Sequence, residues 1–179
     1  MARLVIICFG RLKASLDGRE VAAFESVKVR ALLGILAGEA ALSHSRDRLA
    51  GMLWPGWPQK SALNNLRYAL ADLRKNIGDR SAAPPFLLVD HETLQLNPQG
   101  DWWAACAQFE RLTHPPQSLE ALEQAVALFQ GDFLDGLNLN DSPEFEQWLL
   151  EKREYYRKQA AKMCLLLAEQ GTQEGQFER

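Results

Sequence analysis

Before residue 80 the sequence contains three consecutive segments, each with the residues that typically start and end a helix. This series of three helices restricts the possible folds more than any other feature of the sequence. The predicted helices cover 27–37, a short stretch that starts at Ser43 or Ser45 and ends at Leu53, and 59–77. Ser26 precedes the first helix, where a serine side chain can accept a hydrogen bond from a free backbone N–H. The sequence WPGWP at 54–58 separates the second helix from the third, because proline and glycine do not continue a helix. Gly78 is a typical C-terminal stop for the third helix.

Two β-hairpin patterns flank the predicted helices. Asp17-Gly18 lies between short apolar segments near the N-terminus, and Asp-Gly favours a hairpin because both turn positions tolerate a positive φ. The segments 86–90 and 93–97 have strand patterns and are expected to pair as a second hairpin. An antiparallel sheet, three helices and a hairpin, in this order, are typical of the winged helix-turn-helix. In that fold the third helix enters the major groove of DNA and the hairpin is the wing.

A stretch with proline and glycine at 98–101 indicates a domain boundary. After it the chain is expected to be helical throughout, with helices at 104–112, 118–129 and 142–170. Ser142 marks the start of the last helix clearly, because a capping serine is followed by proline and an acidic residue. Helical hairpins in series suggest a tetratricopeptide-like array. We therefore expect an α+β winged-helix domain at 1–97 and an all-α helical domain at 98–179, the latter truncated at its C-terminus inside a further repeat.

The two halves of the chain differ in charge. Residues 1–97 contain 13 Lys and Arg and 9 Asp and Glu, a net charge of +4. Residues 98–179 contain 7 and 14, respectively, a net charge of −7, and the whole chain therefore carries −3. Such an asymmetry favours a nucleic-acid partner for the first half and a different partner for the second.

The sequence lacks the patterns of catalytic, metal and membrane-spanning sites. Cys8, Cys106 and Cys164 lie far apart without a C-x-x-C pair, which excludes a disulfide framework and a clustered thiolate metal site. There is no G-x-S-x-G, no phosphate-cradling glycine loop and no H-E-x-x-H. No stretch approaches the roughly 20 apolar residues that span a bilayer. We therefore expect a cytoplasmic protein that is not an enzyme, needs no cofactor or metal, and contacts no membrane.

The helix predicted at 59–77 has a polar face opposite its apolar stripe, with basic residues on one flank. Asn and Arg side chains can make bidentate contacts to base edges, whereas Lys and Tyr hold phosphates. The candidate DNA-binding residues on this helix are Lys60, Ser61, Asn64, Arg67, Tyr68, Arg74 and Lys75. Arg46, at the front of the second helix, is a further candidate, for the DNA backbone. The alternative interpretation of the same pattern is an ordinary amphipathic helix with a solvated polar face.

Two other features bear on how DNA could be contacted. The turn of the second hairpin, Asp90-His91-Glu92, is acidic, so its tip would repel phosphate. Tryptophans lie in pairs beside the 54–58 break and at 102–103. Aromatic residues near prolines at a boundary are more typical of packing between subdomains than of a ligand-stacking box, and we interpret these four as packing.

The first half resembles the OmpR/PhoB-like winged helix and, more narrowly, the SARP-type antibiotic regulatory proteins. The residues that carry this resemblance are KVRALL at 28–33, LAGMLWP at 49–55, ALNNLR at 62–67 and LRKNIG at 73–78. The second half is similar to the bacterial transcriptional activator domain (BTAD) that follows the winged helix in that family. The matching residues are DW at 101–102, FE at 109–110, ALFQGDFL at 127–134 and WLLEKR at 148–153.

This resemblance implies a transcriptional activator that binds direct repeats near a promoter and contacts RNA polymerase. It implies base-reading roles for Asn64, Arg67 and Tyr68, with the other candidates of the third helix around the DNA backbone. The helical domain would support a homodimer on DNA. The alternative is a protein–protein interaction module, in which helical repeats bind a partner and the winged helix does not bind DNA. The basic residues on one flank of the helix predicted at 59–77 favour DNA binding over the interaction module, because a protein–protein scaffold does not need them.

Overall fold

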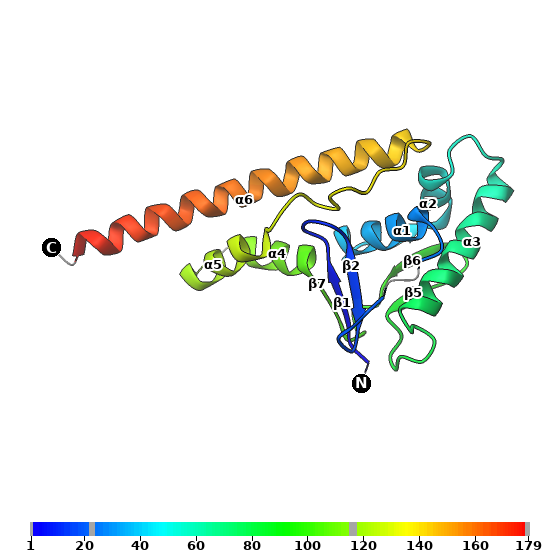
Figure 1. The fold of residues 1–179 in the computed structure, drawn as a ribbon, viewed down its shortest axis with the longest axis horizontal. Helices are drawn as coiled ribbons and strands as arrows, with labels where there is room; N and C mark the ends of the chain where they lie inside the picture. The colour runs from blue at the N-terminus through cyan, green and yellow to red at the C-terminus, as the bar shows by residue number, and fades with distance from the viewer. Residues whose placement is uncertain (1, 22–23, 115–117, 178–179) are drawn as a thin grey trace.

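The computed structural model describes residues 2–21, 24–114 and 118–177, with side chains described up to residue 170. Within these residues the protein is a mixed α+β fold with six helices and seven strands in two small sheets (Figure 1). The strands are β1 (Leu4–Ile7), β2 (Lys13–Leu16), β3 (Arg19–Glu20), β4 (His44–Ser45), β5 (Leu87–Val89), β6 (Thr93–Leu96) and β7 (Trp102–Ala104). The helices are α1 (Val27–Gly38), α2 (Arg46–Leu53), α3 (Gln59–Asn76), α4 (Ala105–Thr113), α5 (Leu119–Leu128) and α6 (Pro143–Phe177). None of the described helices has the length and apolar character that crossing a membrane requires.

The three helices predicted in the first half are confirmed, and their ends follow the expected local signals. The Ser26 hydroxyl accepts a hydrogen bond from the backbone N–H of Val29 at the start of α1. Ser45, rather than Ser43, caps α2 in the same way. Gly78 follows α3 with a φ of 69°, a backbone conformation that glycine adopts without strain.

Both predicted hairpins form. β2 and β3 pair around Asp17-Gly18, whose φ values are 52° and 77°, and β5 pairs with β6 in antiparallel register. Two strands were not expected. β4 adds two residues to the edge of β6, and β7 pairs in parallel with β1, with Leu4 opposite Trp102. The N-terminal sheet has the order β3-β2-β1-β7 and is therefore mixed, not antiparallel throughout.

The expectation that the chain is wholly helical after residue 98 is thus wrong at 102–104. A strand of three residues is too short to show an alternating pattern, and its partner β1 lies almost a hundred residues earlier in the sequence. The other helices of the second half are confirmed. α6 extends beyond its predicted end at residue 170, since a lone glycine such as Gly171 weakens a helix without ending it. Residues 178–179 of the predicted truncated repeat lie outside the described residues.

A loop of the second half packs directly against the first helix. An added Cβ at Gly38 would lie 2.6 Å from the Phe133 ring, and one at Gly34 would lie 2.6 Å from a Leu134 methyl group. These two glycines are four residues apart and share one face of α1, so Phe133 and Leu134 fit where only glycine leaves room. Arg153 of α6 donates hydrogen bonds to the carbonyls of both residues, at 2.9 and 2.7 Å, and holds the loop in place.

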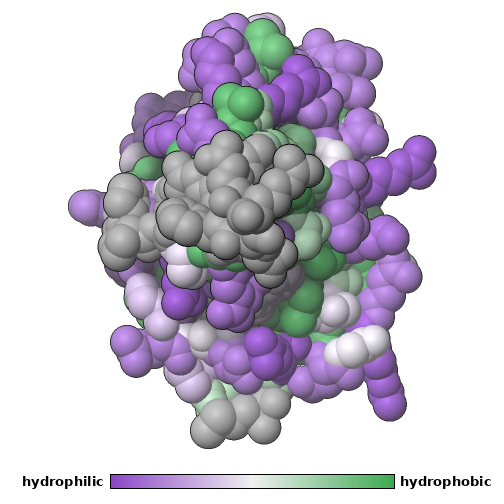
Figure 2. Space-filling view, turned by 90° about the vertical axis from the view of Figure 1, so that its left-hand side faces the viewer, coloured by the Kyte–Doolittle hydropathy of each residue, from purple (hydrophilic) through white to green (hydrophobic). Residues whose placement is uncertain are grey.

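An aromatic cluster continues this packing between the halves. Tyr156 of α6 is fully buried, with ring centroids 5.1 Å from Phe9 and from Phe133 and 6.0 Å from Phe109. Buried residues of both halves therefore form one hydrophobic core. Figure 1 shows α6 running past α4 and α5, with its C-terminal end at the opposite end of the molecule from α3. The face seen from that end of α6 is mostly hydrophilic, with smaller hydrophobic areas between (Figure 2).

Glu39, directly after α1, is the centre of a polar contact between the two halves. Its carboxylate accepts a hydrogen bond from the Trp148 indole at 2.9 Å and lies 3.4 Å from the Lys152 ammonium group, both on α6. On the other side it faces Arg48 at 3.6 Å and the buried His44 at 3.7 Å. Burial raises the pKa of Glu39, but the Trp148 hydrogen bond and these positive charges outweigh burial and hold the pKa below its ordinary value.

His44 gives this contact a predicted pH dependence. Burial, together with the charge of Arg48, lowers the pKa of His44 from the ordinary 6.5, although Glu39 acts in the opposite direction. As the pH falls below about 6.5, the unfolded chain therefore takes up a proton at this histidine before the folded chain does. The free energy of unfolding should be independent of this group above that pH and should fall as the pH drops towards the lowered pKa.

Urea unfolding at pH 7.5, 6.5 and 5.5 measures this effect. The variant His44→Gln should lose less stability between pH 6.5 and 5.5 than the original chain, because it has no proton to take up. His91→Gln, which changes an exposed histidine, should behave like the original chain. Equal pH dependence in all three proteins would show that His44 titrates with its ordinary pKa.

Candidate nucleic-acid interface

α3 presents one polar side to solvent and buries the other. Ala62, Leu66, Leu70 and Leu73 are buried against the rest of the first half. The exposed residues follow the helical spacing on the opposite side, and we call them the outer face of α3: Lys60, Asn64, Arg67, Tyr68, Ala71 and Lys75. In Figure 1, α3 lies at one edge of the molecule, away from α4, α5 and the C-terminal end of α6, so the body of the second half does not cover this face.

The start of α3 has no side-chain cap. Its N-cap is Pro58, which provides no side-chain hydrogen bond, and its first turn contains no acidic residue. No acidic residue of α3 itself therefore offsets the free N–H groups and the positive end of the helix dipole, although the Asp47 carboxylate of α2 accepts a hydrogen bond from the Gln59 side chain at 3.0 Å. Lys60 and the half-buried Ser61 lie at this end, and with Asn64, Arg67 and Arg46 they line a shallow depression of about 550 Å³.

Arg46 is less free than the sequence indicates. Its guanidinium donates a hydrogen bond to the Asp90 carbonyl at 3.0 Å, and its backbone N–H donates to the Glu92 carbonyl at 2.8 Å. It therefore ties the front of α2 to the turn between β5 and β6. The side chain remains half-buried at the edge of the depression, where it can add positive charge without making the first contact.

Arg67 and Tyr68 form a pair in the middle of the outer face. The Arg67 guanidinium carbon lies 5.1 Å from the centroid of the Tyr68 ring, a cation–π contact. Tyr68 is 61% exposed, a large exposed fraction for an aromatic side chain. The contact restricts the long Arg67 side chain and presents its planar group towards solvent, next to the exposed Asn64.

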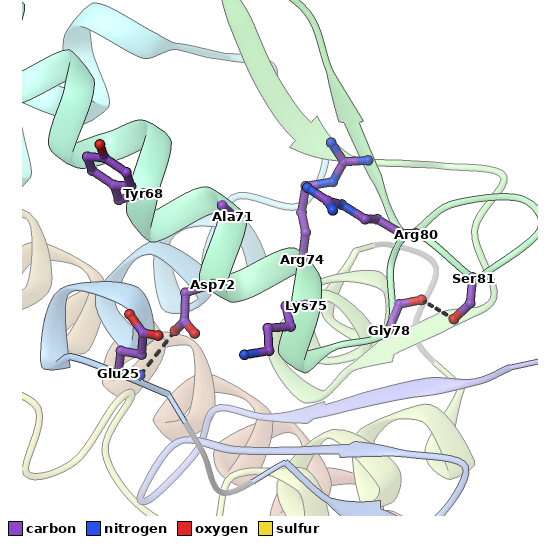
Figure 3. Close-up of a pocket in the computed structure, with 9 residues that line it drawn as sticks. All are labelled: Glu25, Tyr68, Ala71, Asp72, Arg74, Lys75, Gly78, Arg80 and Ser81. Carbon is purple, nitrogen blue, oxygen red and sulfur yellow. Dashed lines mark hydrogen bonds between the residues drawn. The ribbon is translucent and has the colours of Figure 1, made fainter.

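The C-terminal end of α3 contains a second depression, of about 600 Å³ (Figure 3). Arg74, Lys75 and Arg80 bring three basic side chains to its lining, and Glu25 and Asp72 bring two acidic ones. Arg80 is exposed in the loop after the helix, and the periodicity of α3 could not identify it because the helix ends at Asn76. On the other side of the depression, the Asp72 carboxylate accepts a hydrogen bond from the Glu25 backbone N–H at 3.1 Å.

Arg74 has a structural partner that its sequence position did not indicate. Its guanidinium donates to the fully buried Asp79 carboxylate at 2.7 Å, and Asp79 also accepts the backbone N–H of Leu87 in β5 at 2.9 Å. Asp79 thus joins the end of α3 to the hairpin, and Arg74 neutralises its charge. The structure therefore places Arg74 beside the outer face with its polar group already engaged.

Arg74→Ala is expected to reduce the free energy of unfolding by about 1 kcal/mol, because the buried Asp79 loses a charged hydrogen-bond donor that is itself partly exposed. Urea denaturation without any nucleic acid measures the change. The neighbouring Lys75→Ala removes an exposed charge and should stay within about 0.5 kcal/mol of the original chain. If Arg74→Ala leaves the free energy of unfolding unchanged, the ion pair between Arg74 and Asp79 does not stabilise the fold.

The acidic turn between β5 and β6 also has a structural explanation. The Asp90 carboxylate accepts hydrogen bonds from the backbone N–H and the hydroxyl of Thr93 and from the backbone N–H of Glu92, at 2.6–2.8 Å. These bonds, those of Thr93 first, lower the pKa of Asp90 from its ordinary value. Asp90 therefore closes a turn that lacks glycine, and its negative charge is a consequence of that role.

The described residues contain no group of three or more His, Cys, Asp or Glu side chains that could hold a metal ion.

The eight DNA-binding residues predicted from the sequence divide into two groups. Lys60, Ser61, Asn64, Arg67, Tyr68 and Lys75 lie along one accessible side of α3, whereas Arg46 and Arg74 are engaged at its two edges.

No protein-family model matches this sequence, and no curated protein is significantly similar to it. Among solved structures, the chain is similar to Mycobacterium tuberculosis EmbR, determined in complex with a low-affinity phosphopeptide. The TM-score is 0.67 and the identity 21%, over 99% of this chain and 50% of EmbR, so the chain spans about half the length of its solved neighbour. The protein therefore has a fold like that of one half of EmbR.

Proposed function

We propose that this chain is a sequence-specific DNA-binding regulator of transcription, with residues 1–97 as a winged helix that reads DNA through α3. The outer face of α3 is the observation that carries the proposal. It combines an amide, a guanidinium, a phenol and two ammonium groups on one exposed side of a helix, with no acidic side chain among them. An ordinary solvated helix face mixes charges of both signs. The likeness to EmbR, a transcriptional regulator, supports the same function.

The proposed contacts follow from the geometry of the helix. α3 has 18 residues and is about 27 Å long at 1.5 Å per residue, and the major groove is wide enough to admit such a helix. Asn64 and Arg67 read base edges, because each can make a bidentate contact, to adenine and to guanine respectively. The small side chain of Ala71 lets the helix approach the groove floor. Lys60 at one end and Lys75 at the other bind phosphates and fix the position of the helix.

The second half, residues 98–179, is proposed to contact RNA polymerase and to support a homodimer on DNA, as the resemblance to activators with a BTAD implies. Two copies would read direct repeats about one helical turn, roughly 10–11 bp, apart on one face of the duplex. The halves share one core, and β7 of the second half extends the sheet of the first. A partner bound to the second half is therefore held at a defined position relative to the DNA. The protein acts in the cytoplasm, where bacterial DNA lies.

Selection from a pool of random DNA duplexes with the purified full chain tests this proposal. We expect enrichment of a short motif, repeated directly at a spacing of roughly 10–11 bp. The double variant Asn64→Ala/Arg67→Ala should fail to enrich the same motif, while its unfolding by urea is unchanged. A pool that keeps its random composition through repeated rounds would contradict the proposal and favour the interaction module.

A further inference from the structure

A depression of about 690 Å³ lies apart from α3, where α4 meets the segment after α1 and the start of β7. Its lining is mainly apolar and includes Ala40, Pro98, Trp102 and Ala107. The polar part of the lining comes from α4 and its C-terminus: Arg111 and His114, and the acidic Glu110. This size and this mixture, an apolar wall with a few polar groups, are typical of small-molecule sites. None of these residues takes part in the proposed DNA contacts.

Trp102 gives the depression a fixed aromatic surface. Its indole N–H donates a hydrogen bond to the Asn97 carbonyl at 2.6 Å, so the ring is held in one orientation and its polar atom is already satisfied. The side chain is nevertheless only half-buried, so the interpretation of Trp102 as a packing residue accounts for only part of the ring. What Trp102 offers a ligand is therefore an apolar ring surface, next to the small side chains of Ala40 and Ala107, which leave room for a second planar group.

Arg111 brings a positive charge to the same place. It is the only Lys or Arg between residues 81 and 151, in a half of the chain with a net charge of −7. The side chain is exposed, and the described residues provide it with no hydrogen bond or ion pair. The Glu110 carboxylate also lines the depression, but one of its oxygens accepts the hydroxyl of the buried Tyr156 at 3.0 Å, and among the described residues no ion pair joins it to Arg111.

His114 adds a second donor at the same rim. Its Nδ1 lies 2.6 Å from the Glu110 carbonyl, a geometry in which Nδ1 carries the hydrogen and donates. The imidazole is thus oriented by the end of α4 while the ring remains exposed. A planar guanidinium and an oriented imidazole beside an apolar wall match a ligand with an anionic group at one end and a flat apolar body at the other.

We propose that this depression is a binding site for a small aromatic carboxylate. The aromatic ring of the ligand lies against Trp102 and Ala107, and its carboxylate pairs with the Arg111 guanidinium, with His114 as a second partner. The site connects the two halves, because Ala40 directly follows Glu39, the centre of the polar contact with α6. A bound ligand therefore bridges α4 and the segment that leads into β4 of the first half.

Calorimetric titration of the full chain with 2-naphthoate, and with the neutral isostere 2-naphthamide, tests the proposal without DNA. The carboxylate should bind about tenfold or more tightly than the amide, since a charged hydrogen bond contributes more than a neutral one. Arg111→Gln should remove this difference and leave the amide affinity unchanged. Lys162→Gln, which removes an exposed charge on α6, should change neither affinity. The Trp102 indole N–H resonance, assigned with Trp102→Phe, should shift on titration.

Ala107→Trp fills the depression and should abolish binding of both probes. Far-UV circular dichroism checks that each variant is folded, and Arg111→Gln, at an exposed position, keeps the test decisive if Ala107→Trp does not fold. The proposal is overturned if millimolar 2-naphthoate does not bind, if acid and amide bind equally, or if Arg111→Gln binds the acid as the original chain does. These outcomes leave the proposed DNA binding untouched, because no DNA is present.

Discussion

Arg67→Ala is expected to weaken binding to the selected DNA site by about 1–3 kcal/mol, which corresponds to roughly 5- to 150-fold in affinity. Arg67 lies in the middle of the outer face of α3, and its contact with Tyr68 holds the guanidinium towards solvent. A bidentate contact from this group to guanine would be lost entirely in the alanine variant. The preference for one base pair of the motif should be relaxed, while the other positions keep theirs.

Three comparisons make this result specific. Arg67→Lys keeps the positive charge but loses the bidentate hydrogen-bond donor. It should therefore bind random DNA like the original chain, but it should not regain the base preference that Arg67→Ala loses. Lys162→Ala removes an exposed positive charge from α6 and should bind like the original chain. If Arg67→Ala weakens binding equally on the selected and on a random duplex, Arg67 contacts the DNA backbone and does not read a base.

Gly38→Ala is expected to lower the free energy of unfolding by about 1–3 kcal/mol, because the new methyl group enters an occupied space. The added Cβ would lie 2.6 Å from the Phe133 ring, which is fully buried and cannot rotate away as a flexible side chain could. Gly34→Ala should cost less, because its Cβ meets the terminal methyl group of Leu134. The loss of unfolding free energy in Gly38→Ala measures how closely the second half packs against α1.

Gly51→Ala is the matched control for this prediction. Gly51 also lies in a helix, α2, but an added Cβ meets no atom within 4 Å. That substitution should stabilise the protein by about 0.5–1 kcal/mol through the helix propensity of alanine. Urea denaturation gives both values. If Gly38→Ala stabilises the chain as Gly51→Ala does, the contact between Phe133 and α1 is not a tight one, and the halves are not joined there.

Local signals were sufficient to predict most of the secondary structure. Ser26, Asp17-Gly18 and Gly78 act on the residues next to them, so a sequence window contains the whole cause. β7 and β4 were missed for the opposite reason. Each consists of two or three residues and exists because a distant strand offers free backbone groups, and no local pattern records that partner.

The same distinction applies to the candidate site. Helical periodicity was enough to identify which residues of α3 share its exposed side. It could not show that Arg74 is engaged by Asp79, that Arg46 is held by the Asp90 carbonyl, or that Arg80 joins Lys75 from the loop beyond the helix. These relations depend on the placement of segments after the helix ends. The fit of Phe133 and Leu134 on Gly38 and Gly34 is likewise a long-range property.

Fluorescence anisotropy of the full chain on the selected duplex and on a scrambled duplex of the same composition is the most direct test of DNA recognition. At physiological salt, affinity for the selected duplex should exceed that for the scrambled one by about 10³ or more. The logarithm of affinity should fall linearly with the logarithm of salt concentration, with a slope of about −0.9 for each phosphate bound by residues such as Lys60 and Lys75. Equal affinity for both duplexes, or no binding at low salt, would contradict DNA recognition by α3.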